Sequence, residues 1–211
     1  MQSQQETILH INDKPIYLHE DWNHGIGGGL WSTGLAIAKY LSTEHGKEQL
    51  SRRSRVLELG SGNGFLGVCL MAANPQLATV VITDTKEHLP LIQKTLDLNS
   101  VDQKKFNVVE YLWGPTTPQT STAITNSAFD LIVGSDLAYR DELHDPLISS
   151  ILACSSERTI TLLGVTMRDT NPIFFQKLVE AGLSYERLAD HLLEDTFRGS
   201  RFGVFVIWKT K

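Results

Sequence analysis

The stretch Val56–Gly64, with the sequence VLELGSGNG, decides the fold of this chain because it joins a buried strand to a glycine-rich loop. Its apolar residues predict a short strand that is covered on both faces. Gly60, Gly62 and Gly64 permit a sharp turn and a close backbone approach that side chains would block. A helix is expected to begin at Phe65. Strand, glycine turn and helix in this order are typical of a nucleotide-type cofactor pocket.

A second strand follows and ends in a carboxylate. Residues 79–84, with the sequence TVVITD, form a β-branched run that closes at Asp84. This aspartate comes about twenty residues after the glycine loop, the spacing at which a carboxylate accepts both hydroxyls of a ribose. A solvated strand end is the alternative interpretation, and the spacing favours the ribose. Together, the glycine loop and Asp84 predict that the chain binds an adenosine group.

Length and composition favour a single globular domain. The chain has 211 residues, of which 41% are hydrophobic and 20% are charged, enough to bury a sizeable core. The net charge is −5, and the scattered Lys and Arg residues form no basic stripe for a nucleic-acid backbone. We therefore expect no direct nucleic-acid partner. An acidic surface suits basic segments of a protein partner better.

The cysteines and the N-terminal region indicate the compartment. Cys69 and Cys154 are too few and too far apart in sequence for a disulfide framework or a zinc site. The first thirty residues lack a signal-peptide pattern, and no apolar run is long enough for a membrane span. We expect a soluble protein in a reducing, cytoplasmic environment, with presence in the nucleus also compatible, and no membrane partner.

From Arg55 onward, strand and helix patterns alternate, which predicts a parallel sheet covered on both faces. The last two strands are joined at Arg198–Ser200, too short for a crossover helix, so we expect an antiparallel hairpin there. Residues 116–127, rich in Thr, Ser and Pro, are expected to form a surface loop. The expected strands are 55–60, 79–84, 107–112, 129–135, 158–165, 185–192 and 201–209, and the expected helices are 65–73, 86–98, 140–153 and 171–181.

The segment before the core is expected to be a peripheral cover. Residues 7–11 and 16–19 flank a turn sequence and predict a short β-hairpin. After a glycine-rich stretch, an apolar helical face begins near Ser32 or Thr33 as the cap. Trp31 precedes this helix, and packing and ligand contact are equally open for it. We expect one domain over 1–211, divided into a hairpin and loop at 1–29 and the core at 30–211.

The residue before the glycine loop selects the ligand. Residues 62–67 also satisfy GxGxxG, which is compatible with a nicotinamide or flavin dinucleotide. Glu58 lies two residues before Gly60, where a carboxylate would repel a pyrophosphate but suit the ammonium and sulfonium of S-adenosylmethionine. We therefore favour this methyl donor. A dinucleotide and a glycine turn without a ligand stay as alternatives.

Three further residues follow predicted strand ends, where ligands bind in sheets of this kind. Trp113 follows the third strand, where its indole can stack on adenine or serve as ordinary packing. Asp136 and Tyr139 follow the fourth strand and are expected at the pocket rim, beside the transferable methyl. A helix cap and packing are the alternatives for these two residues. The chain lacks the Asn-Pro-Pro-Tyr signature of many enzymes that methylate nucleobases, which disfavours a nucleobase substrate. The histidines have no ligand spacing, so we expect no metal site.

These segments in this order resemble the seven-strand, S-adenosylmethionine-dependent methyltransferases. Within them, the chain is similar to lysine methyltransferase family 16, whose members modify non-histone proteins such as chaperones and translation elongation factors. The resemblance runs from about Gly27 to Tyr139. It is carried by the GGLW stretch at 28–31 and the helix after it, VLELGSGNG, TD at 83–84, LWG at 112–114 and DLAY at 136–139.

The resemblance implies a doubly wound α/β sheet of seven strands in the order 3-2-1-4-5-7-6, with only the last strand antiparallel. It implies methyl transfer from S-adenosylmethionine to a lysine amine of a protein substrate. It also implies a donor site in which Trp31 contacts the donor, Gly60, Ser61 and Gly62 cradle its methionine part, Asp84 with Thr85 holds the ribose, Trp113 borders adenine, and Ser135 lies near the reactive end.

Two residues are assigned to the acceptor side. We expect Asp136 to orient the incoming amine and Tyr139 to wall the lysine channel. We also expect a monomer. A methyltransferase for small molecules, methylation of arginine or histidine, and a catalytically silent donor-binding scaffold remain as alternatives.

Overall fold

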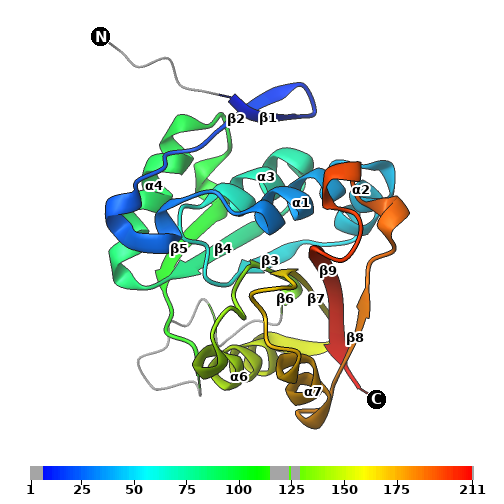
Figure 1. The fold of residues 1–211 in the computed structure, drawn as a ribbon. Helices are drawn as coiled ribbons and strands as arrows, with labels where there is room; N and C mark the ends of the chain where they lie inside the picture. The colour runs from blue at the N-terminus through cyan, green and yellow to red at the C-terminus, as the bar shows by residue number, and fades with distance from the viewer. Residues whose placement is uncertain (1–6, 115–123, 125–128, 211) are drawn as a thin grey trace.

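The fold is built on one mixed sheet. In the computed structural model, which describes residues 7–114, 124 and 129–210, seven strands of these residues form the sheet in the order β5-β4-β3-β6-β7-β9-β8 (Figure 1). This is the order that the resemblance implied, so the predicted fold class is confirmed. The strands are β3 (Arg55–Glu58), β4 (Thr79–Asp84), β5 (Phe106–Glu110), β6 (Phe129–Ser135), β7 (Ser155–Thr166), β8 (Leu183–Arg187) and β9 (Phe202–Lys209).

The direction of the strands also follows the prediction. β3 pairs in parallel with β4 and β6, and β6 pairs in parallel with β7. β9 lies between β7 and β8 and is antiparallel to both. The carboxyl ends of β3, β4 and β6 therefore meet at one edge of the sheet, which is where ligands bind in doubly wound folds.

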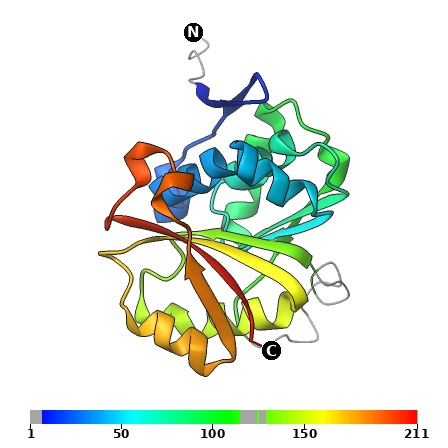
Figure 2. The same ribbon diagram turned by 90° about the vertical axis from the view of Figure 1, so that its right-hand side faces the viewer.

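Helices cover both faces of the sheet, as Figures 1 and 2 show. Val56 and Leu57 are both fully buried, but Val56 belongs to the core beneath α1 and α3, whereas Leu57 belongs to the core beneath α6 and α7. Alternate side chains of a strand point to opposite faces, so a short apolar run serves two cores. The helices are α1 (Ser32–Leu41), α2 (Glu44–Ser51), α3 (Phe65–Ala73), α4 (Leu89–Leu98), α6 (His144–Cys154) and α7 (Ile173–Glu180).

The predicted N-terminal hairpin is present and packs on the core. β1 (Thr7–Ile11) and β2 (Lys14–Tyr17) are antiparallel. Asn12 and Asp13 form the turn with positive φ, as a tight two-residue hairpin turn requires. The Asn12 side-chain amide donates a hydrogen bond to the backbone oxygen of Ala72 in α3 at 3.0 Å. The hairpin is thus fixed to the helix that follows the glycine loop.

Two helical segments that precede β3 were not predicted. α2 has a polar sequence in which Leu50 is the single large buried side chain among its residues, so its apolar periodicity is too weak to detect. The glycine-rich stretch before α1 forms η1 (Trp22–Gly28), which is capped by Asp21 and consists of 3₁₀ turns on either side of a kink at His24 and Gly25. The predicted cap of α1 was also wrong: Trp31 occupies that position without a side-chain cap, and the Thr33 hydroxyl bonds elsewhere.

Several predicted boundaries need correction. The third strand of the prediction, 107–112, is β5 and ends at Glu110, so the residues up to Trp113 follow the strand. The strand predicted at 185–192 is β8 and ends at Arg187. β8 and β9 are antiparallel, but the connection at 188–201 contains two 3₁₀ turns, η5 (Asp190–Leu192) and η6 (Asp195–Phe197). The loop predicted at 116–127 lies outside the described residues except for position 124.

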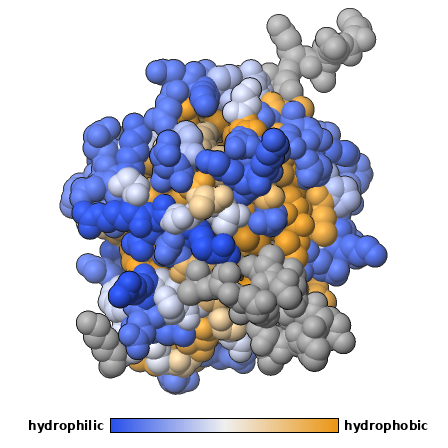
Figure 3. Space-filling view, turned by 180° about the vertical axis from the view of Figure 1, so that it is seen from behind, coloured by the Kyte–Doolittle hydropathy of each residue, from blue (hydrophilic) through white to orange (hydrophobic). Residues whose placement is uncertain are grey.

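Hydrophilic residues cover most of the face seen from behind, with smaller hydrophobic patches between them (Figure 3). Among the described residues, no helix is both long and apolar enough to cross a membrane. The sheet and its two cores are therefore enclosed by a mainly polar surface on this side.

Candidate active site

A narrow cavity lies at the carboxyl edge of the sheet, between the glycine loop and the beginning of α1. Four predicted site residues line it, namely Trp31, Glu58, Ser61 and Ser135. These residues come from three segments of the chain: the residue before α1, the end of β3 with its glycine loop, and the end of β6. The lining is completed by Gly29, Leu30, Gly34, Asn63, Phe65 and Leu66.

The glycine loop has the backbone conformation that the sequence predicts. Gly60 and Gly62 have φ of 56° and 65°, in the region that disfavours side chains. A Cβ atom on Gly62 would lie 2.3 Å from the backbone oxygen of Gly27, and one on Gly60 would lie 2.7 Å from the Trp113 ring. Both glycines are therefore required by conformation and by space, and the loop is enclosed by η1 and Trp113.

Asp84 organises the loop from the end of β4. Its Oδ2 accepts a hydrogen bond from the backbone N–H of Gly62 at 2.7 Å. Its Oδ1 accepts one from the backbone N–H of Thr85 at 2.7 Å and lies 2.7 Å from Nδ1 of His88. A carboxylate has about four acceptor positions, so Asp84 retains acceptor capacity on Oδ2. Asp84, the residue predicted to bind the ribose, therefore lies directly beside the glycine loop.

Glu58 is a buried acid at the end of β3. Its side chain is 2% exposed, and Oε2 has no hydrogen-bond partner among the described residues. Burial raises the pKa of Glu58 from its ordinary value of 4.5 to about 7, although Ser61 and the backbone of Gly67 lower it in part. A buried carboxylate without a counter-charge is costly. It is therefore suited to pair with a cationic ligand.

Two tryptophans border the site in different ways. Trp113 is half-buried, and its ring covers Gly60 of the glycine loop. Trp31 is 39% exposed, and its indole N–H donates to the backbone oxygen of Ile26 at 2.8 Å. Trp22 packs edge-on against Trp31 with ring centroids 6.5 Å apart. Both predicted aromatic residues thus lie at the site, with Trp31 lining the cavity.

Asp136 holds a strained position after β6. Its φ is 52°, which is rare for residues with a side chain. Oδ1 accepts a hydrogen bond from the backbone N–H of Thr166 at 2.7 Å, and Oδ2 accepts one from the Thr33 hydroxyl at 2.8 Å. The carboxylate therefore connects the ends of β6 and β7 to α1. Asp136 is not a helix cap, so that alternative is wrong.

Tyr139 lies three residues further, with 38% of its surface exposed. The loop between Asp136 and Tyr139 is held by His144 of α6, whose Nε2 lies 3.1 Å from the backbone oxygen of Ala138. His144 is fully buried and packs on Phe174. The acceptor-side loop is thus supported by α6 and α7, and the tyrosine ring is left accessible.

Sequence reasoning missed several residues of the site. Asn63 is buried, and its side-chain amide donates to the backbone oxygen of Gly29 at 2.8 Å. Thr33 and Thr166 hold Asp136 over long sequence separations, for which no local pattern exists. His88 was also missed. Its position four residues after Asp84, at the beginning of a helix, is a signal that could have identified it.

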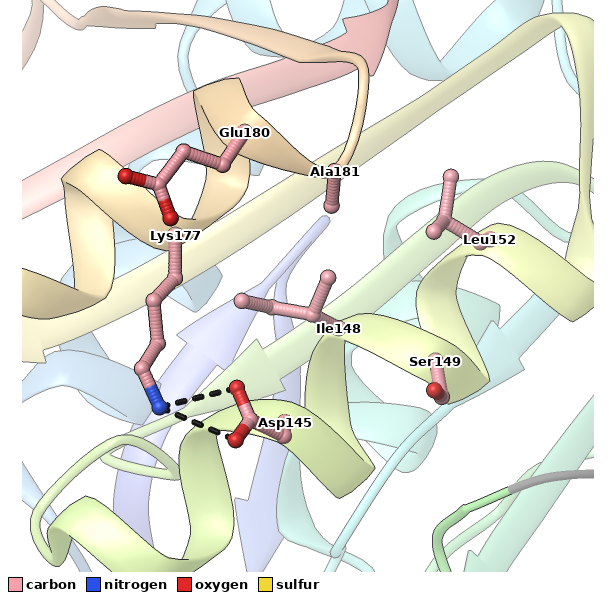
Figure 4. Close-up of a pocket in the computed structure, with 7 residues that line it drawn as sticks. All are labelled: Asp145, Ile148, Ser149, Leu152, Lys177, Glu180 and Ala181. Atoms are coloured by element: carbon pink, nitrogen blue, oxygen red, sulfur yellow. Dashed lines mark hydrogen bonds and ion pairs between the residues drawn. The ribbon is translucent and has the colours of Figure 1, made fainter.

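A larger cavity, of about 380 Å³, lies between α6 and α7 and contains none of the predicted site residues (Figure 4). Lys177 and Asp145 face each other there, with Lys177 Nζ 2.8 and 3.0 Å from the two carboxylate oxygens. Lys177 and Asp145 are thus already paired, and Glu180 accepts a hydrogen bond from the Gln176 side chain at 2.9 Å. Within 7–114, 124 and 129–210, no three or more His, Cys, Asp or Glu residues gather as metal ligands. The chemistry therefore points to the cavity at the sheet edge.

Comparison with known proteins identifies the family. The lysine methyltransferase family model matches residues 10–181. The chain belongs to the lysine methyltransferase family. Protein N-lysine methyltransferase METTL21A of Danio rerio is 30% identical over 158 residues, which cover 72% of this chain and 67% of the relative. Protein-lysine N-methyltransferase EFM6 of Saccharomyces cerevisiae is 26% identical over 173 residues, which cover 73% of this chain and 70% of the relative.

A solved structure agrees with the fold of this lysine methyltransferase family member. The ribosomal protein L11 methylase from Lactobacillus delbrueckii subsp. bulgaricus superposes with a TM-score of 0.57 at 18% identity, covering 87% of this chain and 81% of that chain. At this identity the likeness supports the methyltransferase fold alone. The predicted family, reaction class and methyl donor are confirmed by the family match and the relatives.

The site fits S-adenosylmethionine, the donor of this family. The unpaired Oε2 of Glu58 suits a cationic end, and the backbone of Gly60 and Gly62 forms a cradle that Cβ atoms would fill. Asp84 adds a carboxylate with spare acceptor capacity beside that cradle. The three features lie around one glycine loop, so a single ligand can use all of them.

Proposed function

We propose that this protein transfers a methyl group from S-adenosylmethionine to the side-chain amine of a lysine in a protein substrate, using the site at the carboxyl edge of the sheet. The observation that carries the proposal is the buried carboxyl of Glu58 beside the glycine cradle, whose Oε2 has no hydrogen-bond partner among the described residues. A site built for a pyrophosphate would not hold an acid there. The family match supports the same assignment.

On the donor side, each residue has a distinct task. Glu58 would pair with the ammonium of the donor's methionine part, and Asp84 with Thr85 would hold the ribose. Gly60, Ser61 and Gly62 would cradle the methionine part, and the aromatic and serine residues would complete the enclosure: Trp31, Trp113 and Ser135. When bound, S-adenosylmethionine supplies an electrophilic methyl group on a sulfonium.

On the acceptor side, the protein must present a neutral amine. A lysine with an ordinary pKa of about 10.4 is charged at neutral pH, and removal of its proton costs roughly 4.6 kcal/mol. Burial of the amine and a neighbouring positive charge both lower that pKa. Asp136 would orient the amine, because each of its oxygens keeps a lone pair beyond its bonds to Thr33 and Thr166. Tyr139 would wall the channel.

Translation elongation factors and chaperones are the first candidates for the substrate, because members of the resembled family modify such proteins. The net charge of −5 favours a basic segment around the target lysine. We also propose that the protein acts as a monomer. Light scattering of the purified chain, with and without donor, tests the oligomeric state.

Labelling with a radioactive donor tests the function. The purified protein, incubated with methyl-labelled S-adenosylmethionine and a cell extract, should transfer label to a protein band. Mass spectrometry of that band should locate an added mass of about 14 Da, the mass of CH₂, on a lysine. Label on arginine, histidine or a chain terminus would overturn the lysine assignment and keep the methyltransferase. Label in a small metabolite would overturn the protein substrate, and no label above background would favour a scaffold.

A further inference from the structure

His88 lies between the donor site and the segment that covers it. Its Nδ1 is 2.7 Å from Oδ1 of Asp84, the predicted ribose ligand. Its Nε2 is 3.0 Å from the backbone oxygen of His24, which belongs to η1. The side chain is 17% exposed, so water has limited access to either contact. The imidazole thus bridges β4 and η1.

The partners of His88 decide its charge. A carboxylate and a backbone carbonyl are both acceptors that carry no hydrogen. A neutral imidazole has a single N–H, so one of the two ring nitrogens would face an acceptor lone pair to lone pair. The Thr85 hydroxyl lies 3.2 Å from Nδ1 and can donate to it, but this leaves the closer contact of Nδ1 with Asp84 Oδ1, at 2.7 Å, without a hydrogen. Only the imidazolium donates to Asp84 and to His24 at the same time. The bridge is therefore complete only when His88 is protonated.

The segment held by this bridge encloses the glycine loop. The backbone of Gly27 lies against Gly62, and a Cβ on Gly27 would lie 2.6 Å from Nε2 of His88. The backbone oxygen of Ile26, in the same segment, accepts the indole N–H of Trp31. Fixing η1 at His24 therefore also fixes the covering backbone over Gly62 and the anchor of Trp31.

We propose that His88 is a positioning residue for the methyl donor: its imidazolium holds Asp84 in the orientation that binds the ribose and fastens η1 over the glycine loop. This proposal rests on the proposed donor site. Asp84 keeps acceptor capacity on Oδ2 while His88 and Thr85 occupy Oδ1. The histidine and a ribose hydroxyl can therefore share the carboxylate.

The charges around His88 give the bridge a pH dependence. Asp84 on β4 and Glu87 on η2 (Lys86–His88) face the imidazole, and the ring of His24 on η1 lies 6.5 Å away. The hydrogen bond to Asp84 raises the pKa of His88 above its ordinary value of 6.5, although partial burial opposes the rise. The bridge is complete below that ordinary value and is lost as pH rises through the raised pKa.

Three measurements test the proposal. The first uses the unmodified protein: ring-nitrogen NMR of the donor-free chain at pH 6.5 should show both nitrogens of His88 protonated. A neutral tautomer at that pH would overturn the charge assignment. This result depends neither on activity nor on donor binding, so it separates failure of the bridge from failure of the proposed function.

The second measurement follows the cover itself. Hydrogen exchange of the backbone at 21–29 should be faster in His88→Gln than in the wild type at pH 6.5, and the ratio should approach one at pH 9. His191→Gln, a change of an exposed histidine on η5, is the matched control and should leave this exchange unaltered. Equal exchange in His88→Gln and the wild type at pH 6.5 would overturn the link to η1.

The third measurement is donor affinity by calorimetry. His88→Gln should bind S-adenosylmethionine about tenfold more weakly than the wild type at pH 6, and within about twofold at pH 9. The ratio of the two dissociation constants cancels the titration of Glu58 and of the donor, because both proteins share them. A ratio of the two dissociation constants that stays the same from pH 6 to pH 9 would overturn the positioning role. Tighter donor binding by His88→Gln than by the wild type would also overturn it. If His88→Gln does not fold, His88→Asn, which also keeps a neutral donor, replaces it.

Discussion

The donor side and the acceptor side of the site each contain an aspartate at a strand end, but the two carboxylates are held differently. Asp84 accepts backbone N–H bonds from Thr85, its neighbour, and from Gly62, in the loop it follows. Asp136 is held by Thr33 and Thr166, from α1 and the end of β7. The donor aspartate thus belongs to one βαβ unit, whereas the acceptor aspartate joins three elements of the sheet and its cover.

The two aspartates differ in the backbone strain that their positions require. Asp84 is held by the N–H of Gly62 in the glycine turn, by the N–H of its neighbour Thr85 and by the ring of His88, which is four residues away. Asp136 has a positive φ, which costs on the order of 1 kcal/mol or more and persists only where the surroundings enforce it. We therefore expect changes on the donor side to act on binding, and changes on the acceptor side to act on turnover and on local structure.

Asp136→Ala should have the largest effect on catalysis. Turnover should fall by about 100-fold or more, because an amine that is no longer aligned loses most of the benefit of a positioned reaction. Donor affinity should stay within a few-fold, since the lost interaction matters mainly when the amine is aligned. Rates of methyl transfer and calorimetry of the donor provide the two readouts.

Asp136→Asn separates alignment from strain in this comparison. Asparagine tolerates positive φ and can still accept from Thr166, so this variant should unfold at nearly the wild-type temperature while its turnover stays low. Full activity in Asp136→Asn would show that the carboxylate serves structure alone.

Tyr139→Phe should reduce turnover only a few-fold because the ring remains.

Glu58→Gln should stabilise the free protein and weaken the donor complex. A folded-state pKa raised from 4.5 to about 7 means that the contribution of Glu58 to stability is complete below pH 4.5 and is lost as pH rises to about 7. At pH 8, the variant should therefore gain up to about 3 kcal/mol in free energy of unfolding. Urea unfolding without donor at pH 5 and pH 8 measures the gain, which should shrink at the lower pH.

The same variant should bind the donor more weakly as pH rises. Above about pH 7 the wild-type carboxylate is ionised and can pair with the ammonium, whereas glutamine cannot. We expect a loss of about tenfold in affinity at pH 8 and a smaller loss at pH 6. Equal affinities of Glu58→Gln and the wild type at both pH values would contradict the pairing of Glu58 with the donor.

Asp84→Ala should weaken donor binding by about 1 to 3 kcal/mol, because charge-assisted hydrogen bonds to the ribose are lost. Asp97→Ala, at an exposed position on α4, is the control and should bind the donor normally. Calorimetry with S-adenosylmethionine measures both. Unchanged affinity in a folded Asp84→Ala protein would remove the ribose assignment.

The sequence predicted the donor side better than the acceptor side for a physical reason. The glycines, Glu58 and Asp84 act within about thirty residues of one another, where spacing along the chain determines spacing in the fold. Asp136 was placed at the rim, but its partners Thr33 and Thr166 come from packing of distant elements, which no local pattern encodes. The bridge at His88 depends on η1, a segment whose glycines hid its helical form.

The same reasoning explains the errors in the fold. The central strands and α3 carry strong apolar runs and were predicted with nearly correct boundaries. α2 has a polar sequence, and the connection at 188–201 folds around Leu193 and Phe197, which are buried beside α1. Tertiary burial of isolated residues creates these segments, so periodicity does not reveal them.

The tryptophan variants should have the smallest effects. Trp113→Ala and Trp31→Ala each remove apolar surface at the site. Each change should lower the affinity for the donor by a factor of about two to ten. Trp208→Ala, at a partly exposed position on β9, is the control for loss of an indole. Circular dichroism checks folding. A folded variant with wild-type donor affinity would show that its tryptophan is ordinary packing.

A crystal structure with bound S-adenosylhomocysteine, the demethylated donor, tests the account most directly. We predict that the ribose hydroxyls contact Asp84, that the ammonium lies at Glu58, and that the sulfur points toward Ser135 and the loop after β6. The Asp136 carboxylate should keep its bonds to Thr33 and Thr166. A ligand bound in the cavity between α6 and α7, or one whose ribose lies away from Asp84, would contradict this assignment of the site.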